Sequence, residues 1–232
     1  MPFLARSPLP MNWLAGAWAV FQKDLRVELR SRYAVNSLLL FALGALLVVA
    51  FAIGPQPVSA RVRSALLWVV LLFAASIGLG RSFVAEHEGG TALMLRLHTR
   101  ASMVFAGKLL FNLCLVALLT LTATAVFMLL IGGAVGSPGL FVGTLALGAV
   151  GLTGATTLLS ALVARAARQG PLLPVLVLPL LIPLLISGVG ATRKAILGQG
   201  WTAAQDEVLT LIGFAGATLS AAFLLFDYVW SE

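Results

Sequence analysis

Six long stretches of apolar residues, separated by short polar segments, dominate the chain. They cover about residues 33–53, 64–80, 109–131, 139–164, 171–190 and 208–230. An α-helix rises about 1.5 Å per residue, so roughly 20 apolar residues match the ~30 Å hydrocarbon thickness of a bilayer. The pattern therefore predicts an all-α, polytopic membrane protein whose six transmembrane helices form a single domain over residues 1–232.

A different periodicity precedes the first span, over about residues 12–32. Apolar side chains recur there every three or four residues, and basic side chains occupy the opposite face of the same helix. The apolar positions are Leu14, Trp18, Phe21, Leu25 and Leu29, and the basic positions are Lys23, Arg26 and Arg30. Helices with this pattern lie along a membrane surface, so we expect an N-terminal amphipathic interfacial helix.

Glycine and proline punctuate the spans. Residues 54–57 read Gly-Pro-Gln-Pro and end the first span, because proline lacks a backbone donor and restricts the residue before it. The fifth span contains Pro179 and Pro183, so we expect it to be kinked and packed against other helices that satisfy the freed carbonyl groups. Glycines along the fourth span predict close helix packing. Residues 191–207 are expected to form one or two short helices at the membrane surface.

Charge adds an orientation to this picture. The net charge is +7, but the basic residues lie at the ends of apolar runs and form no patch interleaved with aromatic residues, which argues against nucleic-acid binding. Eleven of the 15 Lys and Arg residues fall in segments on one side of the predicted membrane, and four fall on the other. The positive-inside rule then places both termini and residues 81–108 in the cytoplasm.

Residues 81–108 form the longest polar interruption between spans. They hold two acids, both histidines of the chain and a pair of glycines, followed by leucines that would give a short helix one apolar edge. Such a segment is either a solvated turn or a contact surface for a protein partner. The residues expected to form that contact are Glu86, Glu88, Gly89, Gly90, Leu93, Leu97 and Lys108.

Two residues beside or within the spans carry separate expectations. Lys108, at the start of the third span, is expected to reach the lipid headgroups or to pair with an acid of the N-terminal helix, such as Glu28. Cys114 lies inside an apolar run and is expected to pack as a small buried residue. A single cysteine also excludes an intrachain disulfide.

The sequence lacks the motifs that catalysis or energy coupling requires. It contains no GxxxxGK[ST] loop for nucleotide phosphates, no HExxH and no GxSxG, and its two histidines are too few for a metal site without partners. The first five spans carry no ionisable residue near the middle of the bilayer, where ion-coupled carriers place one. The chain is therefore not expected to be an enzyme, and any energy would come from a partner chain.

An ATP-independent channel remains an alternative, because several polar side chains within the spans are of the kind that lines a pore. They are Asn36, Asn112, Thr120, Thr122, Thr124, Thr153, Thr156 and Thr157.

Several of these features resemble a known family. Glu86, Glu88 and Gly89, the following leucines and then Lys108 are similar to the acid-glycine-leucine-lysine pattern in the membrane subunits of ABC-2 type exporters. The stretches 53–57 (IGPQP), 64–69 (SALLWV) and 177–186 (VLPLLIPLLI) resemble, more narrowly, the CcmB family of cytochrome c maturation system I. The chain departs from that family between Leu97 and Lys108, where His98, Arg100 and Ser102 stand in place of prolines.

The resemblance implies an ABC-2 type exporter fold and the permease subunit of an ABC transporter complex. A CcmA ATPase would bind ATP, CcmC and CcmD would complete the complex, and the cycle would release the haem-loaded chaperone CcmE. Haem would be the ligand of the pathway, with no cofactor bound directly by this chain. A second copy of the chain, the lipid bilayer and a bacterial inner-membrane location are also implied. Export of another lipid-like or small substrate is the alternative within the same class.

Overall fold

The computed structural model describes residues 12–54, 57–79, 101–163 and 172–231, and every regular element in these ranges is a helix. The helices are α1 (Trp13–Ser31), α2 (Tyr33–Ile53), α3 (Ala60–Leu79), α6 (Ala101–Ile131), α7 (Pro138–Val163), α8 (Leu172–Ile196), the 3-10 helix η1 (Trp201–Ala204) and α9 (Gln205–Ser231). Six of the helical segments in the described ranges are long and apolar enough to cross a membrane. The chain is thus an all-α polytopic membrane protein, with six spans in the part that the structure describes.

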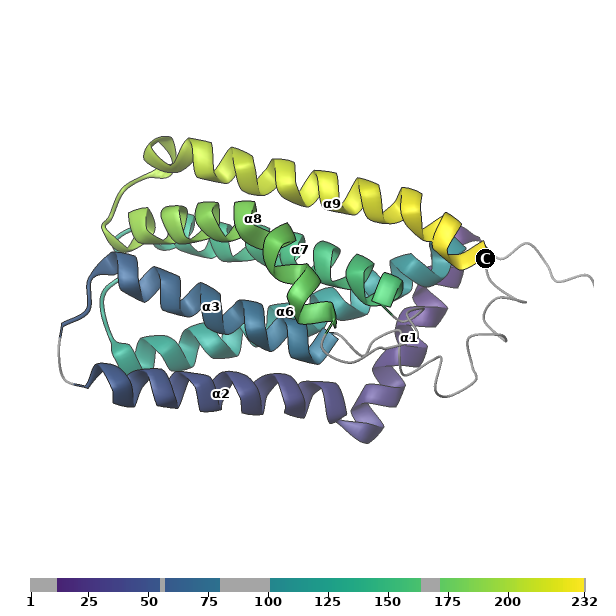
Figure 1. The fold of residues 1–232 in the computed structure, drawn as a ribbon, viewed down its shortest axis with the longest axis horizontal. Helices are drawn as coiled ribbons and strands as arrows, with labels where there is room; N and C mark the ends of the chain where they lie inside the picture. The colour runs from purple at the N-terminus through teal and green to yellow at the C-terminus, as the bar shows by residue number, and fades with distance from the viewer. Residues whose placement is uncertain (1–11, 55–56, 80–100, 164–171, 232) are drawn as a thin grey trace, which may run out of the picture.

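The six spanning helices lie side by side along the long axis, and α1 crosses one end of the bundle (Figure 1). The C-terminus lies at the end that carries α1, which we call the α1 end; the other is the opposite end. The central helix is α7, because 72% of its spanning window is buried, against 17% for α2. Helix α2 packs against α3 and α6 and forms an edge of the bundle.

Glycines give α7 its central position. A Cβ atom on Gly148 of α7 would collide with the indole ring of Trp68 in α3, and a Cβ atom on Gly188 of α8 would lie 2.6 Å from Cε2 of the same ring. The ring therefore fits between two glycine backbones, where it is 1% exposed. Its Nε1 donates a hydrogen bond to Thr192 Oγ1 at 2.9 Å. The prediction that glycines of the fourth span allow close helix packing is confirmed.

Two helices extend six residues or more beyond the ends that the hydrophobic pattern indicates. Helix α6 begins at Ala101 and not near residue 109, and α8 continues to Ile196 and not to about residue 190. Both extensions carry a lysine that has an acidic partner, Lys108 in α6 and Lys194 in α8. Of the short helices expected over residues 191–207, the structure contains η1, whereas Ala191 to Ile196 belong to α8.

Three residues inside the spans show how the helices bend and which faces are exposed. Pro179 and Pro183 both lie within α8, and Figure 1 shows that α8 changes direction along its length. Cys114 of α6 is exposed, so the expectation that it is buried was wrong. The reason is that α6 is apolar on every side, and the face that carries Cys114 points out of the bundle.

Candidate functional site at the junction of α1 and α6

Most of the predicted contact residues lie outside the described ranges. These are Glu86, Glu88, Gly89, Gly90, Leu93 and Leu97, together with both histidines. The structure does describe Lys108 and the helices on either side, because α3 ends at Leu79 and α6 begins at Ala101. The candidate site is therefore the junction that α6 forms with α1 directly after this segment.

Helix α1 lies against the first turns of α6 with very little space between the backbones. A Cβ atom on Gly107 would lie 2.6 Å from the carbonyl oxygen of Ala17 and 2.6 Å from Cβ of Val20. One helix turn earlier in both helices, Gly16 of α1 faces the side chain of Met103. Glycine on each helix thus allows the close approach, as at other helix crossings in membranes.

The residue after Gly107, Lys108, forms an ion pair with α1. Lys108 Nζ lies 3.2 Å from Asp24 Oδ2, and the Asp24 carboxylate is also 3.1 Å from Lys23 Nζ. Lys108 is 1% exposed, so its charge is held inside the protein by α1. A buried ammonium group costs several kcal/mol of solvation, about 3 kcal/mol or more, unless a partner compensates it. The pair therefore makes the position of α6 depend on that of α1.

The expected partner of Lys108 was an acid of α1, and the acid named, Glu28, was wrong. Glu28 lies one turn further along α1, where its Oε1 accepts a hydrogen bond from the Val35 N–H at 2.8 Å. Val35 is in the first turn of α2, whose N–H groups have no partner within the helix. Glu28 thus caps α2, and the negative charge suits the N-terminal end of the helix dipole.

A row of four residues on α1 makes all these contacts, and the sequence interpretation missed it. Gly16, Val20, Asp24 and Glu28 recur every four residues and point toward α6 or α2. The side chains named as the apolar edge include Leu14, Trp18 and Leu29, which are exposed and available to the membrane surface. In the sequence, this row is visible as two small or apolar residues followed by two acids, each four residues after the one before.

A second buried polar contact joins α6 to α7. Asn112, one turn after Lys108, donates from Nδ2 to Thr157 Oγ1 at 2.9 Å, and both residues are 0% exposed. Thr153 and Thr156 of α7 are also buried and donate to carbonyl groups of their own helix. Asn112 and Thr157 thus join α6 to α7, and the hydroxyl groups of Thr153 and Thr156 are satisfied within α7, which differs from the pore lining that the channel hypothesis assigned to these four residues.

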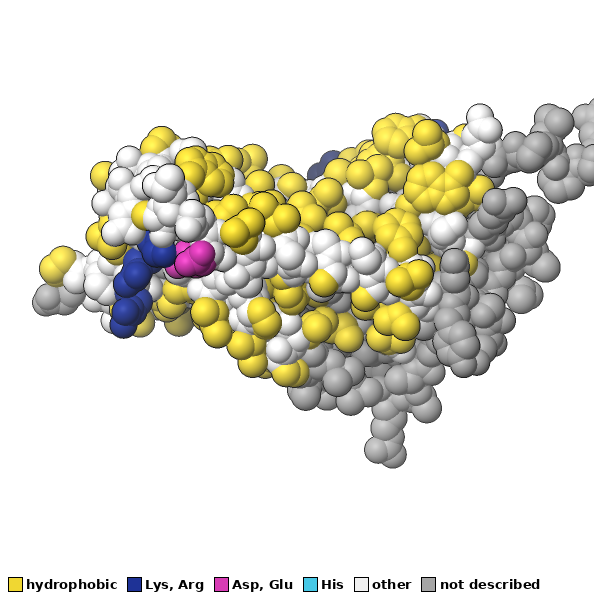
Figure 2. Space-filling model, turned by 90° about the horizontal axis from the view of Figure 1, so that it is seen from above, with side chains coloured by type: hydrophobic (Ala, Val, Ile, Leu, Met, Phe, Trp, Pro, Cys, Tyr) yellow, Lys and Arg dark blue, Asp and Glu magenta, His cyan; other side chains and the backbone are white. Residues whose placement is uncertain are grey.

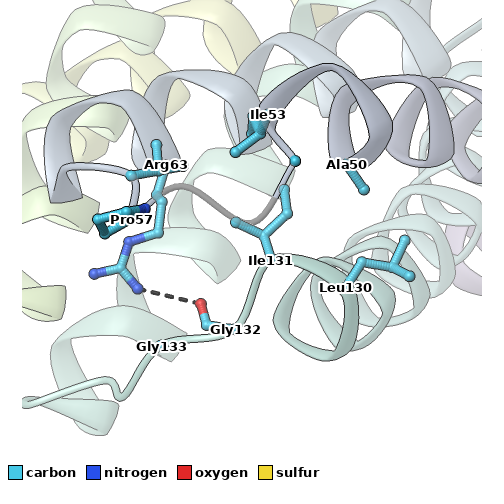
Figure 3. A pocket seen from close by; sticks show the side chains of 10 residues that line it. Ala50, Ile53, Pro57, Arg63, Leu130, Ile131, Gly132 and Gly133 are labelled. Carbon is cyan, nitrogen blue, oxygen red and sulfur yellow. Dashed lines mark hydrogen bonds between the residues drawn. The ribbon is translucent and has the colours of Figure 1, made fainter.

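At the opposite end of the bundle, a basic side chain of α3 is held by a hydrogen bond to the end of α6. Arg63 of α3 donates from Nη1 to the carbonyl oxygen of Gly132 at 3.2 Å, at the end of α6 (Figure 3). Gly132 and Gly133 have φ of 70° and 110°, and a Cβ atom on Gly133 would collide with this guanidinium group. The arginine lines a hollow of about 480 Å³ between the ends of α2 and α6 and the start of α3. It thus caps a carbonyl group at the C-terminal end of α6.

Comparison with known proteins agrees with the resemblance read from the sequence. The family model described as CcmB protein matches residues 15–225. The chain is 34% identical over 203 residues to "Heme exporter protein B" of Bradyrhizobium diazoefficiens, covering 87% of this chain and 91% of that protein. It is 30% identical to the protein of the same name from Rhodobacter capsulatus, covering 87% and 92%, and 29% identical to that from Paracoccus denitrificans, covering 89% and 93%. With this coverage and the fold described above, the chain belongs to the CcmB family.

Proposed function

We propose that the chain is the membrane subunit of an ABC transporter complex that handles haem during cytochrome c maturation. Three curated relatives that match nearly their whole length carry the name "Heme exporter protein B". The chain has no nucleotide-binding loop of its own, so a partner resembling CcmA would hydrolyse the ATP. In this proposal the ATP cycle drives release of a haem-loaded chaperone resembling CcmE, and CcmC and CcmD complete the assembly.

The Lys108–Asp24 ion pair is the observation that most supports a mechanical role. Residues 81–100 directly precede α6, and α6 is fixed to α1 within its first two turns by Gly107 and Lys108. Asn112 then links α6 to α7, the central helix. A push on the segment before α6 would therefore displace α1, α6 and α7 together, because each contact is close and buried.

The ATPase would bind the segment that precedes α6. Glu86 and Glu88 would pair with basic residues of the partner, Gly89 and Gly90 would turn the backbone, and Leu93 and Leu97 would dock. Charged pairs of this kind fix the register of a contact more than they add affinity. The orientation that suits this arrangement has both termini and the α1 end in the cytoplasm, at the inner membrane of a bacterium.

A complete transporter would contain two copies of the chain, because ATP-binding cassettes act in pairs and each needs a membrane half to move. The proposed seam is the first span, α2, or the fifth span, α8. Helix α2 is the least buried of the spans, and its exposed side chains include Leu40, Val48 and Phe51. An apolar face of that kind suits either lipid or a second copy.

The test of the proposal is co-purification in mild detergent followed by measurement of ATPase activity. An ATPase subunit should co-purify with the chain, and ATP hydrolysis in the complex should exceed that of the isolated ATPase. The double variant Glu86→Gln with Glu88→Gln should lower this stimulation at least several-fold while leaving membrane insertion intact. Asp206→Asn, which removes an exposed acid at the opposite end, is the matched control. Equal stimulation in the double variant and the control would overturn the assignment of the contact segment.

A further inference from the structure

The opposite end of the bundle has a second hollow, between α3 and α8, with a volume of about 460 Å³. Its lining combines two arginines with aliphatic side chains. The residues are Arg61 of α3 and Leu185, Ile186, Val189, Gly190 and Arg193 of α8. No acid and no His, Met or Cys is among them.

The lining of this hollow is ordered along the membrane normal. The α8 residues fall at positions 185, 186, 189, 190 and 193, so they form one stripe along the helix. At about 1.5 Å per residue, Leu185 lies roughly 12 Å deeper in the bundle than Arg193. Arg61 is at the beginning of α3, so both guanidinium groups sit at the end of the hollow nearest the surface and the aliphatic stripe runs from them toward the middle of the bundle.

The two arginines carry charge that the described residues do not neutralise by an ion pair. Glu207, the acid whose charge acts on Arg193, is paired with Lys194, which also donates to the carbonyl oxygen of Ala203 at 2.7 Å. Arg193 interacts electrostatically with Glu207 but forms no ion pair with it. Arg61 is exposed. Figure 2, which views the molecule from above Figure 1, shows basic side chains beside an acidic one at one end of the bundle, and apolar side chains over much of the remaining surface.

We propose that this hollow binds an anionic phospholipid, with the phosphate group between Arg61 and Arg193 and one acyl chain along Leu185, Ile186 and Val189. Guanidinium groups bind phosphate oxygens through paired, charge-assisted hydrogen bonds. Arginines at the ends of spanning helices reach the headgroup depth, where they meet the phosphate groups of lipids. The aliphatic stripe below them matches an acyl chain in both polarity and position.

Other anions fit the same lining less well. A soluble phosphate would use the arginines and leave the aliphatic stripe unoccupied. Haem would find carboxylate partners in the arginines but no axial ligand in the lining, because histidine, methionine, cysteine and tyrosine are all absent from it. A second copy of the chain would need an acid to face the two arginines. The site therefore stands independently of the haem-related function proposed above.

Native mass spectrometry of the purified chain, released from nanodiscs with equal amounts of phosphatidylglycerol and phosphatidylcholine, tests the proposal. The wild-type protein should retain phosphatidylglycerol in preference to phosphatidylcholine. The double variant Arg61→Gln with Arg193→Gln should lose about one bound phosphatidylglycerol and bind it at least tenfold more weakly, whereas Arg61→Lys with Arg193→Lys should keep part of the preference. Arg63→Gln is the control, because Arg63 is in the same turn of α3 but lines the other hollow. If the double variant does not fold, Arg61→Gln alone serves, since that side chain is exposed.

Several outcomes would overturn the proposal. Unchanged retention of phosphatidylglycerol in the glutamine variants would show that the arginines do not bind it. A loss of added haem from the double variant, with phosphatidylglycerol unaffected, would assign the hollow to haem. Crosslinking between two copies of Ile186→Cys in lipid nanodiscs, absent from the parent chain with its exposed Cys114, would show that a second chain covers it. A fault in ATPase coupling would leave all these measurements unchanged, so the two proposals fail separately.

Discussion

Asp24 of α1 and Lys108 of α6 are 84 residues apart in the chain, and their charged atoms lie 3.2 Å apart. The lysine is 1% exposed, and the aspartate side chain is 12% exposed. The pair therefore lies where α1 crosses α6, with the cation inside the protein and the acid at its margin.

Removing the charge of Asp24 should be costly, because it leaves the buried Lys108 without this partner. Asp24→Asn should lower the free energy of unfolding by about 3 kcal/mol. Lys108→Met should lower the free energy of unfolding by less, because Asp24 keeps Lys23 at 3.1 Å. The double variant should lose less free energy of unfolding than the sum of the two single losses. Lys23→Met, on the more exposed side of the same acid, is the control, with an expected effect within about 1 kcal/mol. Unfolding by denaturant in detergent micelles measures all four; strictly additive losses would contradict a direct pair.

Gly107 should not tolerate even a methyl group. Gly107→Ala brings a Cβ atom to 2.6 Å from the Ala17 carbonyl oxygen, so α1 must move away from α6. Overpacking of this kind costs about 1–3 kcal/mol. Gly44→Ala in α2 is the matched control, because no atom lies within 4 Å of its added Cβ. Thermal unfolding of both variants in detergent measures the difference, and an equal midpoint would show that the two helices are not in contact in solution.

The indole of Trp68 should be equally sensitive to the glycine beside it. Gly148→Ala places a methyl group where the ring lies, and we expect the ring to shift and its hydrogen bond to Thr192 to weaken. The loss should reach about 2 kcal/mol, from overpacking and from the weakened hydrogen bond together. Gly216→Ala in α9, where nothing lies within 4 Å, should not lower stability and should raise it by up to about 1 kcal/mol. Denaturant unfolding compares the two variants, and a neutral Gly148→Ala would place the ring elsewhere.

Glu28 should act as a helix cap and not as a partner of Lys108. Glu28→Ala removes the acceptor of the Val35 N–H and should cost about 1 kcal/mol, as caps generally do. Glu28→Gln keeps an acceptor oxygen and should cost less. The effects of Glu28→Ala and Lys108→Met should be additive, in contrast to those of Asp24→Asn and Lys108→Met. A coupling between Glu28 and Lys108 larger than about 1 kcal/mol would restore the partner first expected from the sequence.

The number and order of the spans were predictable, because bilayer thickness sets the length of an apolar run. Which face of each helix is buried was not predictable. In α6, apolar residues cover every side, and lipid is as apolar as the protein interior, so periodicity does not tell whether Cys114 faces inward. Membership of the family was readable from short stretches such as residues 177–186, since these depend on the order of residues and not on their contacts.

The candidate site was only partly predictable for the same reason. A lysine at the edge of a span predicts an acidic partner or the headgroups, and α1 offers Asp24 and Glu28 one turn apart. Which acid Lys108 contacts depends on the angle at which α1 crosses α6, and Gly107 and Gly16 set this by allowing the backbones to approach. That crossing exists only in the folded chain. The contact residues between Glu86 and Leu97 stay a prediction.

A single residue, Arg32, links α1 to α2, so α1 can tilt only about this point. Arg32 has φ of 52° and donates its N–H to the Glu28 carbonyl oxygen at 2.6 Å, so the two helices meet without a flexible loop. At about 1.5 Å per residue, Asp24 is roughly 12 Å from Arg32 and Trp13 roughly 28 Å. A tilt of about 10° then moves Asp24 by only ~2 Å and Trp13 by ~5 Å. A lysine side chain can follow Asp24 over that distance, whereas the contact between Gly16 and Met103, twice as far from Arg32, would open.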